Sequence, residues 1–304
     1  MNTITGIGSA LFDMLLYCNT FPPEDKKMEA DKTVLQGGGP CSTALVAASK
    51  LGIQTGYIGL VGDDFFGDFI RNDFQKYNVD VTGLHTVKNC RSFHSMVLCS
   101  KEKGSRTCVW NKGNLPEPNA ADFNLTDLLK GTKIVHLDGY YTKFAVEAAK
   151  IVHKAGGLVS LDAGTIRPGI EDVMKQTDIL IASADFAKTV GGCSTVTDAV
   201  IALNRKYHPA HLAVTCGADG GLFLQKGKPV QYPAYKSEVV DSNGAGDVFH
   251  GAFLVGLLKG WDDEKCCWFG SAVSAMKCKV YGARAGVPSF ADAVAFYERK
   301  ELEA

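Results

Sequence analysis

The chain of 304 residues is 46% hydrophobic and 21% charged, which is ordinary for a globular protein that buries a substantial core. Its formal net charge of −1 excludes a general electrostatic attraction to nucleic acid or to an acidic membrane surface. No stretch reaches the roughly 18 apolar residues that a membrane span needs, and the first residues contain neither a basic region nor a long apolar run. We therefore expect a cytoplasmic protein that has no signal peptide and binds neither nucleic acid nor membrane.

The ten cysteines and seven histidines indicate neither a disulfide framework nor a metal site. The cysteines are irregularly spaced and include no Cys-x-x-Cys pair, and the histidines show no metal-ligand spacing. We expect reduced cysteines that pack as small hydrophobic residues, as in cytosolic proteins.

The first forty residues predict a strand, a projecting strand pair and the start of a helix. Residues 3–9 favour a strand, and Asp13 follows its carboxyl end, where open α/β sheets bind ligands. Residues 14–35 are too polar and too broken for a core helix, so we expect a strand pair that projects from the body. Glycines then lead into a helix over residues 41–52, with Pro40 in its first turn and Gly52 at its end.

The next segment predicts a second pair of projecting strands. Residues 54–60 favour a strand and residues 69–77 a helix, joined by a glycine turn that we interpret as structural. Residues 92–98 and 106–110 alternate in polarity across a Lys-Glu-Lys-Gly turn, which is typical of a β-hairpin. With residues 14–35, this hairpin would form a small separate sheet.

From residue 133 onwards, short apolar runs alternate with helical patterns. We expect strands at residues 134–137, 158–162, 179–182 and 212–216, helices at 144–155 and 196–207, and a hairpin over 221–232. A further helix is expected over residues 265–280. This alternation is typical of a parallel sheet that is covered by helices on both faces.

One loop near the carboxyl end concentrates the chemistry. After the extended pair Val239-Val240, the chain reads Asp-Ser-Asn-Gly-Ala-Gly-Asp from Asp241 to Asp247 and then enters an apolar helix. The small residues allow an anion to reach unpaired N–H groups at the positive end of the helix dipole. Asp247 in the first turn would repel a static phosphate, but it suits a base that orients a hydroxyl for phosphoryl transfer.

This heptapeptide resembles the D-T-x-G-A-G-D signature of ribokinase-like (PfkB) sugar kinases, and the likeness extends over nearly the whole chain. The resemblance implies a single ribokinase-like domain over residues 1–304, with a three-layer α/β/α core and a small β-sheet lid inserted at about 14–35 and 90–112. It also implies ATP and Mg²⁺ as cofactors. Asp247 would be the catalytic base, and the amides of Gly244, Ala245 and Gly246 would form the anion hole.

The resemblance also assigns binding residues. Those implied for the sugar are Asp13, Lys27, Gly38, Gly39, Thr43, Asn111 and Asp247. Those implied for the nucleotide are Thr215, Gly217, Gly220, Gly244, Gly246, Ala283 and Gly286. Thr43 departs from the pattern because ribokinase itself carries Asn there, which weakens the case for a pentose.

The cation sites follow the family pattern only in part. The family's N-x-x-E motif, which helps to place magnesium, is replaced by Ser183-Ala184-Asp185-Phe186, with Asp185 out of register. Asp241 and Asn243 are the implied ligands of a monovalent cation, together with carbonyls of residues 286–289. We expect modest activation by K⁺ rather than absolute dependence.

The substrate remains open between several sugars. Features around Gly246 and Lys277 resemble sulfofructose kinases, in which Lys27 and Asn111 would hold the sulfonate, but the Arg that this subgroup carries near residue 139 is absent. We therefore favour a neutral ketohexose, phosphorylated on a primary hydroxyl, over sulfofructose.

Other classes stay as alternatives. Phe93 and Trp110 in the lid would suit a nucleoside kinase of the same fold, whereas the intact Asp247 speaks against an inactive sugar-binding regulator. No G-x-G-x-x-G follows the first strand, which disfavours a dinucleotide-dependent oxidoreductase. Lid sheets of the family often pair between subunits, so the resemblance allows a homodimer.

Overall fold

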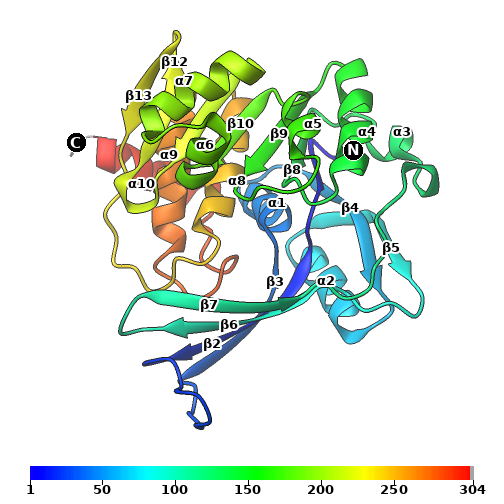
Figure 1. Cartoon of the computed structure of the whole chain (residues 1–304), viewed down its shortest axis with the longest axis vertical. Helices are drawn as coiled ribbons and strands as arrows, with labels where there is room; N and C mark the ends of the chain where they lie inside the picture. Colours follow the sequence, from blue (N-terminus) through cyan, green and yellow to red (C-terminus); the bar gives the residue numbers. More distant parts are fainter. Residues whose placement is uncertain (302–304) are drawn as a thin grey trace.

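The computed structural model describes residues 1–301, with side chains for residues 1–299, and contains two separate sheets (Figure 1). The larger sheet has the strand order β13-β12-β11-β10-β9-β8-β1-β4-β5, and all neighbours from β11 to β5 run parallel. Its strands are β1 (Ile4–Ile7), β4 (Thr55–Gly62), β5 (Val79–Val87), β8 (Ile134–Leu137), β9 (Leu158–Ala163), β10 (Ile179–Ser183), β11 (His211–Thr215), β12 (Gly221–Gln225) and β13 (Lys228–Tyr232).

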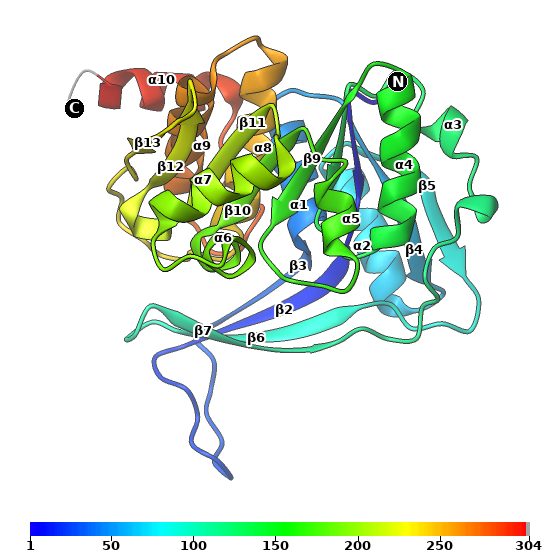
Figure 2. The ribbon, with the colours of Figure 1, turned by 45° about the horizontal axis from the view of Figure 1, so that its top comes forward.

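Helices cover both faces of this sheet, as the alternation of strands and helices predicted (Figures 1 and 2). Ile179 and Ile181 of β10 point into one core, and Leu180 and Ala182 between them point into the other. The first core is closed by α1 (Pro40–Lys50), α2 (Phe65–Lys76), α8 (Ala245–Leu258), α9 (Asp263–Lys277) and α10 (Phe290–Glu301). The second is closed by α3 (Leu125–Leu128), α4 (Thr142–Lys154), α5 (Ile170–Met174), α6 (Ala184–Gly191) and α7 (Val196–Tyr207).

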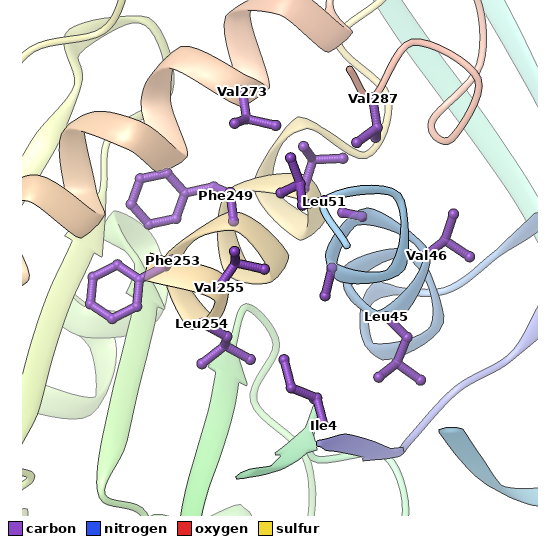
Figure 3. Close-up of a cluster of buried hydrophobic side chains, with 14 of the residues drawn as sticks. Ile4, Leu45, Val46, Leu51, Phe249, Phe253, Leu254, Val255, Val273 and Val287 are labelled. Carbon is purple, nitrogen blue, oxygen red and sulfur yellow. The ribbon is translucent and has the colours of Figure 1, made fainter. Parts of the chain in front are cut away.

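Helix α8 is the central helix of the first core. All residues from Val248 to Gly256 are buried, because α1 and α9 pack against its flanks and the sheet lies beneath it (Figure 3). A side chain at Gly251 would overlap the carbonyl oxygen of Ala44, so α1 and α8 approach closely only because this residue is glycine. The anion loop is thus attached to one of the most firmly packed helices.

The smaller sheet lies across the lower edge of the body and has the order β3-β2-β6-β7 (Figure 2). Its strands are β2 (Leu11–Cys18), β3 (Lys32–Gly38), β6 (His94–Ser100) and β7 (Ser105–Asn111). One face packs on the body through Leu15, Tyr17, Val97 and Cys99. The connection between β2 and β3, residues 19–31, projects away from the body in Figure 2.

Several sequence-based boundaries differ from the structure. The first strand ends at Ile7, and Asp13 lies within lid strand β2, so the lid begins earlier and extends later than residues 14–35. Val239 and Val240 are not in a strand; they belong to an irregular segment between β13 and α8. Strand β5 and helices α3, α5, α6 and α10 were not predicted.

Two further expectations can be compared with the described residues. The cysteines of residues 1–301 are all free. Among the helices in this range, none combines the length and the apolar character required to cross a bilayer.

Candidate active site

The site lies where the order of the parallel strands reverses. From β1 the chain proceeds to β4 and β5 on one side of the sheet, and then to β8 and the remaining strands on the other. Ligands of open α/β sheets bind at the carboxyl ends of the strands at such a switch point. Ser9 after β1 and Asp138 after β8 meet there, with the Ser9 N–H and hydroxyl donating to Asp138 Oδ2 at 2.8 and 2.7 Å. Asp138 therefore joins the two strand ends.

Helix α8 begins within the anion loop, as its sequence predicted, but Ala245, one of the three residues predicted for the anion hole, already uses its N–H within the loop. Helix α8 begins at Ala245, and Gly244 precedes it in the left-handed conformation at φ 71°. Ala245 N–H donates to Ser242 O at 3.2 Å and Val248 N–H to Gly244 O at 2.9 Å. In the part of the chain that the structure describes, the N–H groups of Gly246 and Asp247 make no backbone hydrogen bond across this turn, so they are available to an anion.

Gly246 is glycine for a reason other than packing. A side chain built on it would meet no protein atom within 4 Å, and its backbone is helical. Since neither the fold nor the backbone conformation requires glycine here, the empty volume is what the residue provides. Gly246 also lines a cavity, so this open space is accessible to a phosphate that approaches the free N–H groups.

Asp247 is the third residue of α8, and two other carboxylates lie close enough to act on it electrostatically. Burial, together with the negative charges of Asp162 and Asp138, raises the pKa of Asp247 to about 7. The pKa of Asp162 is also raised, first by burial and then by Asp138. A carboxyl group with such a pKa is poised to accept and release a proton near neutral pH.

A neutral histidine borders this carboxylate group. His250 Nε2 lies 3.4 Å from Asp162 Oδ1, and burial lowers the pKa of His250 to about 3. The imidazole therefore stays uncharged and contributes a hydrogen-bonding ring rather than a counterion. Positive charge comes instead from Arg284 and Arg106, both of which lower the pKa of Asp247.

The residues predicted to bind the sugar gather mostly at the root of the lid. Asp13 accepts a hydrogen bond from the Ser95 hydroxyl, and burial raises the pKa of Asp13 while the charge of Arg284 opposes the rise. A side chain on Gly38 would overlap the Asp13 carboxylate. Thr43 on α1 lies between Arg284 and the turn at Gly244, and Gly39 caps the same helix.

Two predicted sugar ligands lie elsewhere. Lys27 is exposed in the projecting connection 19–31. Asn111 ends β7 opposite His94, whereas Asp13 is aligned with Ser95 and Trp110. Because side chains alternate between the faces of a strand, this register places Asn111 out of line with Asp13.

A cavity of about 390 Å³ opens on the other side of the anion loop. Its walls include Thr215, Gly217, Gly220 and Gly246 of the predicted nucleotide residues, with Phe249 and Ala275 adding apolar surface. Gly217 and Gly220 both have positive φ, at 61° and 78°, so the turn requires them. An apolar wall beside free N–H groups fits a base and its phosphates.

The other predicted nucleotide residues do not line this cavity. Ala283 is buried, donates its N–H to Gln36 of the lid at 2.8 Å and packs against Gly244. A side chain on Gly286 would crowd Lys277 at the end of α9 and Val280 in the segment that follows. Their roles in nucleotide binding remain predictions.

The stretch that replaces the magnesium motif begins α6. The Ser183 side chain accepts from the Phe186 N–H at 3.3 Å and caps the helix. Asp185 is 94% exposed, lies 3.1 Å from Lys188 and borders a cleft of about 700 Å³ that also contains Thr215 and Gly217. Mg²⁺ keeps several waters and binds chiefly to phosphates, so an exposed carboxylate at this cleft fits a contact with the ion through its water molecules.

The predicted ligands of a monovalent cation already have a partner. Lys277 Nζ donates to the main-chain oxygens of Asp241, at 2.8 Å, and of Asn243. Burial lowers the pKa of Lys277, and the charge of Asp241 opposes the decrease. The residues present therefore do not fit a free K⁺ ion at these oxygens.

Sequence reasoning missed Lys277, Arg284, Asp138 and Asp162. Asp138 and Asp162 each follow or end a predicted strand, so their position at the carboxyl edge of the sheet could have indicated them. Lys277 and Arg284 offered a weaker signal, namely a cation within an otherwise apolar or small-residue stretch.

Comparisons with known proteins show the family of this chain. A model of the pfkB family of carbohydrate kinases matches residues 1–289. Ribokinase of Bacillus subtilis (strain 168) is 26% identical over 295 residues, covering 95% of this chain and 97% of its own length. Ketohexokinase of Mus musculus is 25% identical over 296 residues, covering 91% and 96%.

Solved structures show the same fold. A protein of Agrobacterium tumefaciens has a TM-score of 0.92 at 24% identity, with 100% of this chain and 99% of its own covered. Arabidopsis thaliana ribokinase complexed with ribose and ATP has 0.84 at 24%, covering 98% and 99%. An Escherichia coli protein in complex with ATP and Mg²⁺ has 0.85 at 21%, covering 98% and 100%.

The ribokinase-like fold, with its nine-stranded main sheet and separate four-stranded lid, and the anion loop with its carboxylate define a kinase that acts on alcohols. The chain belongs to the pfkB family of carbohydrate kinases and is an ATP-dependent sugar or nucleoside kinase of that family.

Asp247→Asn should lower kcat by roughly 10²-fold or more, because the amide cannot accept the proton of the attacking hydroxyl. Binding of ATP, measured by calorimetry, should persist.

In the unmodified enzyme kcat/KM should fall as the pH decreases through about 7, where Asp247 becomes protonated. Asp162→Asn removes a negative charge that raises this pKa, so the acid limb should move to lower pH.

Asp172→Asn, at an exposed position of α5, is the control for the pH profile. Near-normal turnover of Asp247→Asn would contradict the assignment of the base. If the acid limb of the pH profile stays at the same pH in Asp162→Asn, the charge of Asp162 does not raise the pKa of Asp247.

Gly246→Ala should raise the KM for ATP or lower kcat by about tenfold or more, since a methyl group enters the space above the anion site. Its midpoint of urea unfolding should stay near that of the original protein. Gly251→Ala, one turn further along α8, should instead destabilise the fold by about 1–3 kcal/mol through overlap with α1. A stability loss in Gly246→Ala equal to that in Gly251→Ala would contradict this division of roles.

Proposed function

We propose that this kinase transfers the γ-phosphoryl group of ATP to a primary hydroxyl of a neutral ketohexose. The observation that carries the proposal is the position of Asp247 in the first turn of α8, beside free N–H groups and close enough to further carboxylates for their charges to raise its pKa. The hydroxyl oxygen attacks the γ-phosphorus, the bond to the β-phosphate oxygen breaks, ADP leaves and the proton passes to Asp247.

The anion loop stabilises the charge on the phosphoryl group during its transfer. Charge that develops on the transferring phosphoryl group faces the N–H groups at the start of α8, which are fixed before the substrate arrives. When bound, Mg²⁺ neutralises charge on the ATP oxygens. Arg106 on β7 adds a positive charge from the lid, close enough to act on Asp247.

The charges around the pocket favour a neutral sugar. Asp13, Asp138, Asp162 and Asp247 supply acceptors for hydroxyl groups, and such a set would repel an anionic substrate. Lys27, the lysine that the resemblance implies for a sulfonate, is exposed in the projecting connection 19–31. A sugar with several hydroxyl groups and no charge fits these partners better.

One observation favours a second candidate, a ketose with an anionic group such as sulfofructose. Arg167 follows β9, and its guanidinium lies over the Tyr140 ring at 4.8 Å, while its buried Nε has no hydrogen-bond partner among the described residues. Tyr140 contacts Phe93, and Phe93 contacts Trp110 of the lid, with ring centroids 5.7 and 5.6 Å apart. Arg167 could thus supply the cation that is missing near residue 139.

The outer face of the lid supports a proposed homodimer. The strand register aligns Leu35, Met14, Met96 and Val109 in one row across all four strands. Leu35, Met96 and Val109 are 46%, 47% and 71% exposed, although they are large and apolar. A second lid pairing with this row would cover it.

A coupled assay of ADP release with ketoses, aldoses, sulfofructose and nucleosides tests the substrate. Fructose-type ketoses should give a higher kcat/KM than sulfofructose, and Lys27→Ala should change the neutral reaction by less than about tenfold because no buried charge is stranded. Arg167→Gln should likewise leave the neutral ketose nearly unaffected. Preference for sulfofructose that Arg167→Gln abolishes would select the second candidate, and preference for a nucleoside would overturn both.

The double variant Met96→Asp/Val109→Asp should be monomeric, because two carboxylates would be buried without partners in the lid interface. Light scattering after gel filtration should give twice the chain mass of 32.6 kDa for the original protein and a single chain mass for the variant. Ile201→Asp, an exposed apolar position on α7, should remain dimeric. A monomeric original protein would contradict the proposed dimer.

A further inference from the structure

Lys277 is a fully buried lysine beside the anion loop. It is the last residue of α9, its side chain is 0% exposed, and its Nζ donates to the main-chain oxygens of Asp241 and Asn243. A lysine is almost never buried unless its charge is paired or fully hydrogen-bonded. Its place against two carbonyls of a catalytic loop therefore calls for a specific role.

The remaining polar groups of Asp241 are also occupied. Its carboxylate accepts from Tyr17 Oη at 2.5 Å, from the Gly282 N–H at 2.8 Å and from the Asn243 N–H at 2.8 Å. The segment before the loop is fixed as well, since the N–H groups of Val240 and Asp241 both donate to Cys278 O. The Asp241 carboxylate and the main-chain oxygens of Asp241 and Asn243 thus already have donors from the chain.

The contact with Lys277 fixes the direction of the loop's peptide groups. In a planar trans peptide the C=O and the following N–H point in opposite directions. A carbonyl of Asn243 that faces Lys277 therefore turns the Gly244 N–H away from it, and the same holds for Asp241 and the Ser242 N–H. A cation behind the loop holds the amides of its front side in place for the phosphates.

We propose that the ammonium group of Lys277 permanently takes the place of a monovalent cation behind the anion loop, so that this kinase needs no K⁺. Lys277 is a positioning residue that acts through the loop and does not touch the substrates. The inference rests on phosphoryl transfer as such, and it holds for whichever sugar proves to be the substrate.

The unmodified enzyme provides the first test. Its kcat and its melting temperature should agree within about twofold and about 2 °C between buffers of KCl and of tetramethylammonium chloride at equal ionic strength, since no site remains for the ion. Activation by K⁺ of more than about fivefold, or a clear stabilisation by K⁺, would overturn the proposal. The melting temperature is informative without any sugar, so an incorrect choice of substrate cannot imitate this result.

Lys277→Met provides the second test, because it keeps the length of the side chain and removes its charge and donors. In tetramethylammonium buffer kcat should fall about 10- to 100-fold, the loss expected when carbonyls lose a charge-assisted partner. K⁺ or NH₄⁺ should restore most of the activity and raise the melting temperature of this variant, because a small cation can bind to the oxygens of Asp241 and Asn243. The dependence on K⁺ would then be created by the substitution.

Lys279→Met is the matched control. Lys279 lies two residues further on and is exposed, and the one contact described for its side chain is with the Phe296 ring at 5.3 Å. The kcat and the melting temperature of the Lys279→Met variant should not depend on K⁺. A folded Lys277→Met that no small cation rescues would overturn the proposal. Should this variant not fold, Lys277→Gln carries the same rescue test, and the comparison of buffers with the unmodified enzyme decides independently.

Discussion

The buried guanidinium of Arg284 connects the three parts of the molecule that must meet at the site. It pairs with Asp73 of α2 at 2.5 Å, donates to the Ser42 hydroxyl of α1 at 2.7 Å and contacts the carbonyl oxygen of Gly38 in lid strand β3. Arg284 itself belongs to the segment after α9 and is only 1% exposed. Breaking such a buried pair leaves an uncompensated charge and costs about 3–5 kcal/mol. The root of the lid is consequently fixed relative to the core.

The same guanidinium also offsets part of the electrostatic repulsion among the carboxylates of the site. Asp13 and Asp247 both lie close enough to Arg284 for its charge to lower their pKa, whereas burial and neighbouring carboxylates act in the other direction. For Asp247 the raising effects prevail, since its pKa lies near neutrality. A carboxylate with the full strength of its usual acidity would be a poor base for a hydroxyl group. The fold thus sets the pKa of Asp247 through the number and distance of its charged neighbours.

Elements of the fold that depend on local sequence could be predicted, and those that depend on distant contacts could not. The strand Ile134–Leu137 and the helix Val196–Tyr207 have the predicted bounds, because an apolar run and a capping Thr195 define them locally. In the site, the loop from Gly244 to Asp247 was recognised by its small residues. Lys277 was not, because a lysine in a helix usually faces solvent, and only the folded chain shows which carbonyls surround it.

The anion loop is held from behind and open in front, and this asymmetry explains its composition. Behind it, Lys277 donates to the main-chain oxygens of Asp241 and Asn243, and Tyr17 donates to the Asp241 carboxylate. In front, Gly246 exposes backbone without any side chain, and among the described residues the N–H groups of Gly246 and Asp247 have no backbone partner. A flexible loop would lose conformational entropy each time a phosphate bound, at about 1–2 kcal/mol per ordered residue. Fixing the loop from behind removes that cost before the substrate arrives, so that binding energy remains for the transition state.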